Sequence, residues 1–187
     1  FEWQLQPGQS FHTPEAVMIY SKDGLNGMSE KFHGFIRHHI FPPAFQNQER
    51  PILFNNWEAT YFDFDQQDLT ELGEMAADLG AELFVLDDGW FGQRNSDRSS
   101  LGDWQVNTAK LPDGLKGLSE ALEQRGLQFG LWLEPEMISQ NSQLAGRHPD
   151  WFLSIPDRPV AEGRNQLVLD LSRQEICDFL VDTLDKI

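Results

Sequence analysis

Short apolar runs alternate with longer amphipathic segments from residue 51 to the end of the chain. Each short run has the length of a buried strand, and each longer segment carries apolar residues at the spacing of one helix face. The predicted strands cover residues 52–54, 83–86 and 127–133, and the predicted helices lie around 69–79, 115–122 and 172–187. This alternation predicts an α/β fold with helices outside a parallel sheet. Three or so such units, joined by right-handed crossovers, make part of a (β/α)8 TIM barrel.

Two long loops follow predicted strands, over residues 89–113 and 137–166, and a short strand over 167–171 comes inside or after the second loop. Loops at the ends of strands are where barrel enzymes place their chemistry. Ser172 and Glu175 have the spacing of a capping box, which predicts the start of the last helix.

The first part of the chain follows another pattern. Residues 1–5 and 16–20 read as strands, and residues 25–40 have helical spacing. We therefore expect residues 1–45 to be the end of an N-terminal β domain with a connecting helix, and residues 46–187 to be the N-terminal part of the barrel. Because the chain begins with Phe and ends inside a predicted helix, we also expect it to be a piece of a longer protein.

Two adjacent carboxylates, Asp87 and Asp88, come directly after the predicted strand 83–86. Neighbouring residues of a strand point to opposite faces, so both can reach one ligand only where the strand has ended and begun to turn. Such a pair suits two adjacent hydroxyl groups, because each charged oxygen accepts hydrogen bonds. The alternative is that one of them caps the turn or pairs with Arg94 or Arg98.

Glu134 and Glu136 follow the third predicted strand, with a proline between them. A retaining glycosidase needs two carboxyl groups roughly 5 Å apart, and an inverting one needs a wider pair. These two glutamates are therefore a candidate catalytic pair. The alternative, which we favour, is that they form salt bridges with loop arginines and shape the end of the strand.

Aromatic rings also gather at strand ends, where a ring is more exposed to a cleft than in mid-strand. Four of the six tryptophans lie there: Trp57, Trp90, Trp104 and Trp132. A flat indole ring covers the apolar face of a pyranose, so tryptophan beside carboxylates is typical of a sugar site. Arg164 lies in a loop just before residue 167 and is either a solvated charge or part of the same site.

The net charge of −16 argues against nucleic acid and against anionic membrane surfaces as partners. A single cysteine excludes an internal disulfide and fits a reducing compartment. No apolar run has the length of a membrane span, and no signal peptide is present, so we expect a cytoplasmic protein. No motif for a metal or nucleotide cofactor occurs, and we expect none.

Several long motifs, taken in order, resemble the bacterial α-galactosidases of glycoside hydrolase family 36. They include Asn-Asn-Trp-Glu-Ala-Thr, Leu-Asp-Asp-Gly-Trp-Phe-Gly and Trp-Leu-Glu-Pro-Glu-Met, and the matching segments are 7–15, 29–33, 55–60, 86–92, 101–104 and 132–137. The resemblance implies an N-terminal β-sandwich, a central (β/α)8 barrel and a C-terminal β domain. Residues 1–45 would then come from the end of the sandwich.

The resemblance also implies which residues bind sugar. Asp87 and Asp88 would accept hydrogen bonds from the 4- and 6-hydroxyls of a terminal galactose, Trp57 and Trp132 would wall the pocket, and Arg164 would point into it. The substrate would be an α-galactoside of the raffinose or melibiose type, with no cofactor, and the parent protein would be a homo-oligomer.

Catalysis in this family is retaining and uses two aspartates. The nucleophile lies in a Lys-Trp-Asp motif at the end of the fourth barrel strand, and neither that motif nor the acid/base motif occurs here. We therefore expect both catalytic carboxylates beyond residue 187 and an inactive isolated chain. The rivals are an α-N-acetylgalactosaminidase or a raffinose-type galactosyltransferase on the same barrel, and a non-catalytic galactoside-binding fragment.

Overall fold

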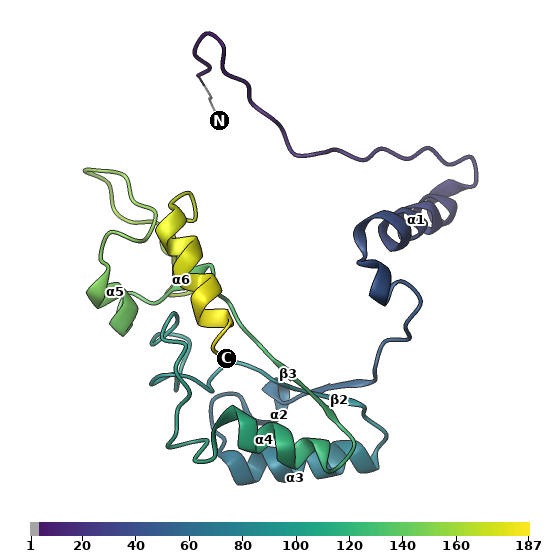
Figure 1. The fold of residues 1–187 in the computed structure, drawn as a ribbon, viewed down its shortest axis with the longest axis vertical. Coiled ribbons are helices and arrows are strands. Elements are labelled where there is room, and N and C mark those ends of the chain that lie inside the picture. Colours follow the sequence, from purple (N-terminus) through teal and green to yellow (C-terminus); the bar gives the residue numbers. More distant parts are fainter. Residues whose placement is uncertain (1–3) are drawn as a thin grey trace. The chain divides into compact units, whose positions relative to one another are not determined.

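The structure is a computed structural model that describes residues 4–187 (Figure 1). Contacts divide it into two compact units, the first ending at Arg50 and the second covering Pro51–Ile187. This division lies five residues beyond the boundary expected after residue 45. The origin of the first unit in a β-sandwich stays a prediction.

The first unit contains a helix, α1 (Gly24–Phe35), that continues directly into a π-helical turn, η1 (Ile36–Ile40), followed by the 3-10 turn η2 (Pro43–Phe45). The helix expected over 25–40 is thus present. The strand expected over 16–20 is wrong, because those residues belong to no strand. A lone extended segment has no ladder partner and does not persist as a strand. The strand expected over 1–5 lies mostly outside the described residues.

The second unit is built on a parallel sheet of three strands, as expected. The strands are β1 (Leu53–Asn55), β2 (Leu83–Leu86) and β3 (Gln128–Leu131), in the order β1-β2-β3. Every pair is parallel, and Phe54, Phe84 and Phe129 are in register across the sheet. Phe84 and Leu86 are completely buried, as a strand covered by helices requires.

Three helices connect these strands: α2 (Trp57–Thr60), α3 (Gln66–Asp78) and α4 (Gly114–Glu123). A capping box between Asp65 and Asp68 starts α3. The helices α3 and α4 lie side by side along the sheet (Figure 1). Gly73 makes this close approach possible, because a Cβ atom there would lie 2.2 Å from Cδ2 of Leu122. The core beneath them joins these helices to the sheet and the long loop after β2.

A separate small sheet follows. The strands β4 (Met137–Ile138) and β5 (Leu167–Val168) pair antiparallel, with α5 (Gln143–Arg147) between them and α6 (Gln174–Leu184) after them. They share a second hydrophobic core around Ile138, Trp151 and Ile176. The continuous loop expected over 137–166 is therefore wrong, and so is the five-residue strand over 167–171, which has only two residues in β5.

The last helix also starts differently. Its N-cap is Arg173, and no side chain caps the helix. The Ser172 hydroxyl donates instead to Asp170 Oδ1 at 2.6 Å, while Arg173 binds the carboxylate of Glu175. The capping box expected at Ser172 and Glu175 is therefore wrong, because both of its members have stronger local partners.

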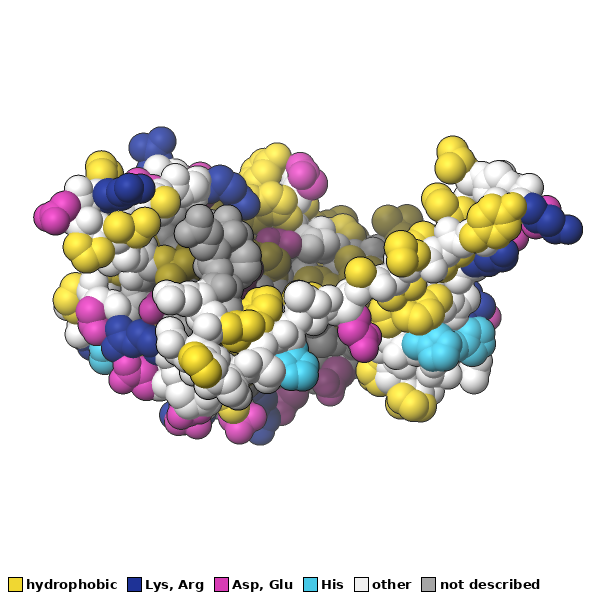
Figure 2. All heavy atoms as spheres, turned by 90° about the horizontal axis from the view of Figure 1, so that it is seen from above, with side chains coloured by type: hydrophobic (Ala, Val, Ile, Leu, Met, Phe, Trp, Pro, Cys, Tyr) yellow, Lys and Arg dark blue, Asp and Glu magenta, His cyan; other side chains and the backbone are white. Residues whose placement is uncertain are grey.

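Several hydrophobic side chains are exposed at the surface, among acidic and basic side chains (Figure 2). They include Leu53, Tyr61 and Leu79, which are 54%, 51% and 90% exposed. Within residues 4–187, no helix is both long and apolar enough to cross a membrane.

Candidate functional site

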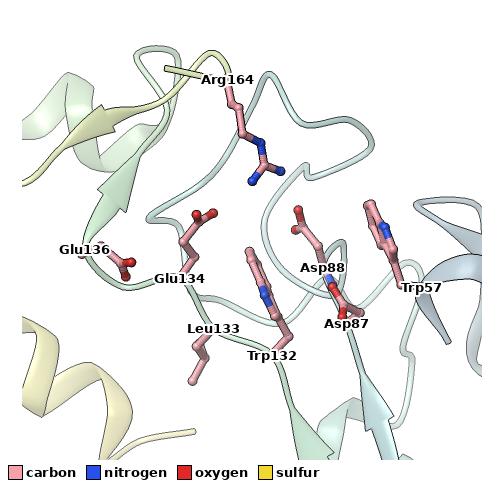
Figure 3. Close-up of a pocket in the computed structure, with 8 residues that line it drawn as sticks. All are labelled: Trp57, Asp87, Asp88, Trp132, Leu133, Glu134, Glu136 and Arg164. Atoms are coloured by element: carbon pink, nitrogen blue, oxygen red, sulfur yellow. The ribbon is translucent and has the colours of Figure 1, made fainter. Parts of the chain in front are cut away.

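A cavity of about 360 Å³ lies where the three parallel strands end (Figure 3). Eight residues line it: Trp57, Asp87, Asp88, Trp132, Leu133, Glu134, Glu136 and Arg164. The five residues that the sequence analysis selected for sugar binding are all in this lining. Two indole rings, four carboxylates and one guanidinium group therefore face a single space.

Parallel pairing explains why residues distant in sequence meet here. Asp87 directly follows β2, Trp132 directly follows β3, and Trp57 begins α2 just after β1. The carboxyl ends of parallel strands lie at one edge of the sheet, so these side chains converge. Arg164 arrives from the chain between β4 and β5, where its backbone has a φ of 54°. Its guanidinium group extends toward the space between Glu134 and Asp88 (Figure 3).

The end of β1 holds Asp87 in place. Asn55 Nδ2 donates to Asp87 Oδ2 at 2.6 Å, and the buried Asn56 side chain accepts a hydrogen bond from the Asp87 backbone N–H at 2.8 Å. Asn55 Oδ1 also accepts from the backbone N–H of Trp57 at 2.8 Å. One amide side chain therefore orients two lining residues at once. Neither Asn55 nor Asn56 was expected to have a role, although both lie in the Asn-Asn-Trp motif.

Asp88 is held in another way. The fully buried Arg94 donates from Nε to both carboxylate oxygens at 2.9 and 3.1 Å, and from Nη2 to Oδ2 at 2.7 Å. Only 6% of Asp88 is exposed, so this is a buried, bidentate ion pair. Pairing with Arg94 and facing the cavity were alternatives in the sequence analysis, and the structure contains both.

Lys110 fixes the loops behind the two aspartates. Its ammonium group donates to the carbonyl oxygens of Phe62 at 2.7 Å and Gly89 at 3.1 Å, and it contacts the carbonyl oxygen of Arg94 at 3.4 Å. Burial lowers the pKa of Lys110 below its ordinary 10.5, although nearby carboxylates, including Asp88, act in the opposite direction. Nothing in the sequence pattern identified this lysine.

The four tryptophans at strand ends do not behave alike. Trp57 and Trp132 line the cavity, and Trp57 packs edge-on against Tyr61. Trp90 is fully buried and Trp104 is 7% exposed. The exposure to a cleft that we expected for a ring at a strand end is therefore wrong for Trp90, whereas Trp104 lines a second cavity beside Leu115 and Phe179. Trp90 instead supports the site, because its Nε1 donates to the carbonyl oxygen of Trp132 at 3.1 Å.

Glu134 and Glu136 both line the cavity. Among residues 4–187, neither forms a salt bridge with an arginine, which contradicts the alternative we favoured. Glu134 Oε2 instead accepts a hydrogen bond at 3.0 Å from Nε2 of the buried Gln166. The described residues contain no group of three His, Cys, Asp or Glu side chains that could hold a metal ion.

Similarity to known proteins shows which family this chain belongs to. The Melibiase family model matches residues 10–187. This chain belongs to the Melibiase family. It is 58% identical over its whole length to alpha-galactosidase AgaA of Geobacillus stearothermophilus and 50% identical to alpha-galactosidase 1 of Pediococcus pentosaceus. It covers 26% of each, so the chain spans about a quarter of the length of these relatives.

Solved structures of the Geobacillus enzyme have the same fold. A variant of AgaA in complex with raffinose has a TM-score of 0.94 and 58% identity, covering 98% of this chain and 26% of that protein. Another variant, in complex with stachyose, has a TM-score of 0.92 at 58% identity, covering 97% and 25%. The chain thus has an α/β fold similar to the part of these family 36 α-galactosidases that it covers.

Proposed function

We propose that this chain supplies the galactose-binding part of the active site of an α-galactosidase. The single observation that carries the proposal is the cavity in which Trp57, Asp87, Asp88, Trp132 and Arg164 meet. The full-length protein would remove terminal non-reducing α-galactose from raffinose- or melibiose-type sugars. The raffinose and stachyose complexes of its relative support this substrate class.

The chemistry of the lining fits a pyranose. An indole ring at Trp57 or Trp132 covers the apolar face of the sugar, while Asp87 and Asp88 accept hydrogen bonds from neighbouring hydroxyls. The axial 4-hydroxyl distinguishes galactose from glucose. A site that hydrogen-bonds this hydroxyl rejects the epimer strongly, because its buried acceptors would be left without a donor.

We further propose that β1, β2 and β3 are the first three strands of a (β/α)8 barrel. In a retaining mechanism one carboxylate attacks the anomeric carbon and a second protonates the leaving oxygen. Both would come from parts of the barrel beyond residue 187, because the Lys-Trp-Asp motif that carries the nucleophile in this family does not occur in this sequence. Arg164 would donate to sugar oxygens from the opposite side.

The test is hydrolysis of p-nitrophenyl α-galactoside by the full-length protein and by the 187-residue chain. Activity in the full-length protein alone supports the proposal. Lack of activity in a folded full-length protein that still binds galactose would make it a galactoside-binding protein. A faster reaction with an N-acetylgalactosaminide, or transfer to sucrose in place of hydrolysis, would favour the two rival activities on this barrel.

One rival has support from the geometry, because Glu134 and Glu136 both face the cavity. A glycosidase that used this pair would be active as the isolated chain. Activity of the chain that is abolished by Glu134→Gln would therefore refute the assignment of catalysis to residues beyond the chain.

A further inference from the structure

We propose that Arg94 is a positioning residue that fixes the carboxylate of Asp88 for one sugar hydroxyl and so sets discrimination at that hydroxyl. The inference rests on the proposed galactose-binding role of the cavity. Arg94 is completely buried and does not line the cavity, so it acts on a sugar only through Asp88.

The geometry of the ion pair restricts Asp88 to one orientation. Three N–H···O contacts of 2.7 to 3.1 Å join the guanidinium group to both carboxylate oxygens. The two carboxylate oxygens together have about four lone-pair positions. Arg94 uses two of them on Oδ2 and one on Oδ1, which leaves one position on Oδ1 to accept from a sugar hydroxyl. Rotation of the carboxylate would break at least one of these contacts.

Arg94 is itself fixed by its surroundings. Nη1 donates to the carbonyl oxygen of Ser99 at 2.9 Å, and the guanidinium carbon lies 5.7 Å from the centre of the Phe62 ring. The carbonyl oxygen of Arg94 is contacted by Lys110 Nζ at 3.4 Å. Because both its side chain and its backbone are held, Arg94 is a rigid support for Asp88.

The two aspartates therefore depend on different supports. Asp87 is held by neutral donors, the Asn55 amide and the backbone N–H of Asp88, whereas Asp88 is held by a charged planar fork. A lysine at position 94 would retain the positive charge but could not donate to both carboxylate oxygens in the same planar arrangement, because its ammonium group is a compact point charge. Arg94→Lys should therefore loosen Asp88 and leave the contacts of Asp87 in place.

The experiment measures kcat/KM of the full-length protein on p-nitrophenyl α-galactoside and on its 4-deoxy and 6-deoxy analogues. Wild type is compared with Arg94→Lys and Arg94→Gln. Arg125→Lys is the matched control, because Arg125 pairs with Glu74 in a half-exposed salt bridge and neither residue lines the cavity. Arg94→Lys should lower kcat/KM on the galactoside by roughly 10- to 100-fold, by analogy with the range seen when a residue that orients a metal ligand is removed.

The pattern across substrates decides the role. The loss should shrink to about threefold or less on the one deoxy analogue that lacks the hydroxyl bound by Asp88, and persist on the other, as expected when enzyme group and hydroxyl are coupled. An equal loss on all three substrates, or failure of both Arg94 variants to fold while Arg125→Lys folds, would assign Arg94 to stability alone and overturn the proposal. Absence of wild-type activity on the galactoside would instead refute the proposed function.

Discussion

The change Asn55→Asp places a second carboxylate where Asn55 Nδ2 now donates to Asp87 Oδ2 at 2.6 Å. The new group has nearly the shape of the amide but cannot donate when ionised. Two unit charges 4 Å apart repel by about 4 kcal/mol at an effective dielectric constant of about 20. The substitution therefore replaces an attraction by a repulsion between two groups that flank the cavity.

The pair can escape this repulsion by taking up one proton, which restores an O–H donor between the two groups. Protonating a carboxyl of the ordinary aspartic acid pKa of about 3.9 costs about 4 kcal/mol at pH 7 and about 1.5 kcal/mol at pH 5. At pH 7 this cost about equals the repulsion that it relieves, so roughly half of the full-length Asn55→Asp protein carries the proton and kcat/KM should fall only about twofold. Relative to wild type, the loss should vanish toward pH 5 and grow by up to about tenfold per pH unit above pH 7.

The assay is hydrolysis of p-nitrophenyl α-galactoside between pH 5 and about pH 8.5. Asn55→Ala removes the donor without adding a charge, so its loss should not depend on pH in this way. Asn95→Asp adds the same charge at an exposed loop residue and should leave the rate unchanged. An Asn55→Asp protein with wild-type activity, or with a loss that is constant across this range, would refute the reasoning.

Three further outcomes are expected for the full-length protein. Asp87→Ala should lower kcat/KM on the order of 10²-fold or more, and an unchanged value would remove Asp87 from the site. Gly73→Ala should lower the melting temperature, because overpacking against Leu122 at 2.2 Å costs about 1–3 kcal/mol and the gain in helix propensity is only about 1 kcal/mol; Gly34→Ala, which meets no atom within 4 Å, should not. Because burial lowers the pKa of Lys110 below 10.5, the unfolded chain binds this proton more tightly. The wild-type melting temperature minus that of Lys110→Met should therefore rise as the pH increases toward 10.5, and a constant difference would contradict the shift.

The regular elements were predictable because their apolar spacing is strong and their ends are marked. The strand over 83–86 has the predicted bounds, since its apolar run stops abruptly at Asp87. The strand β4 has two residues, which is too short for any periodicity to register, and of the strand predicted over 167–171 only Leu167 and Val168 form β5. The parallel pairing of the three strands also followed from the alternation of strands and helices.

The residues that line the cavity could be predicted from the sequence, but most of the residues that hold them in place could not. A residue at a strand end can face the cavity, as Trp132 does, or turn into the core, as Trp90 does. Position along the chain does not distinguish these cases, because the direction is set by how the following loop packs. Pairing of an aspartate with Arg94 was an alternative that the sequence offered, whereas the contacts of Lys110 depend on the same loop packing and no local pattern indicates them.

The arrangement of the site shows why neighbouring aspartates can serve one cavity. The strand β2 ends at Leu86, and Gly89 has a φ of 107° that only glycine adopts readily, so the chain turns just after the pair. Each carboxylate is then held by a different segment of the chain. Asn55 at the end of β1 donates to Asp87, and Arg94 in the loop after β2 donates to Asp88. In residues 4–187, β1 and β3 each pair on one side only, so the strands that position Trp57 and Trp132 have open edges. Unpaired strand edges promote association with other chains. The part of the cavity around Asp87 and Asp88 is therefore held by contacts within this chain, whereas the strands that carry Trp57 and Trp132 need further strands to cover their open edges.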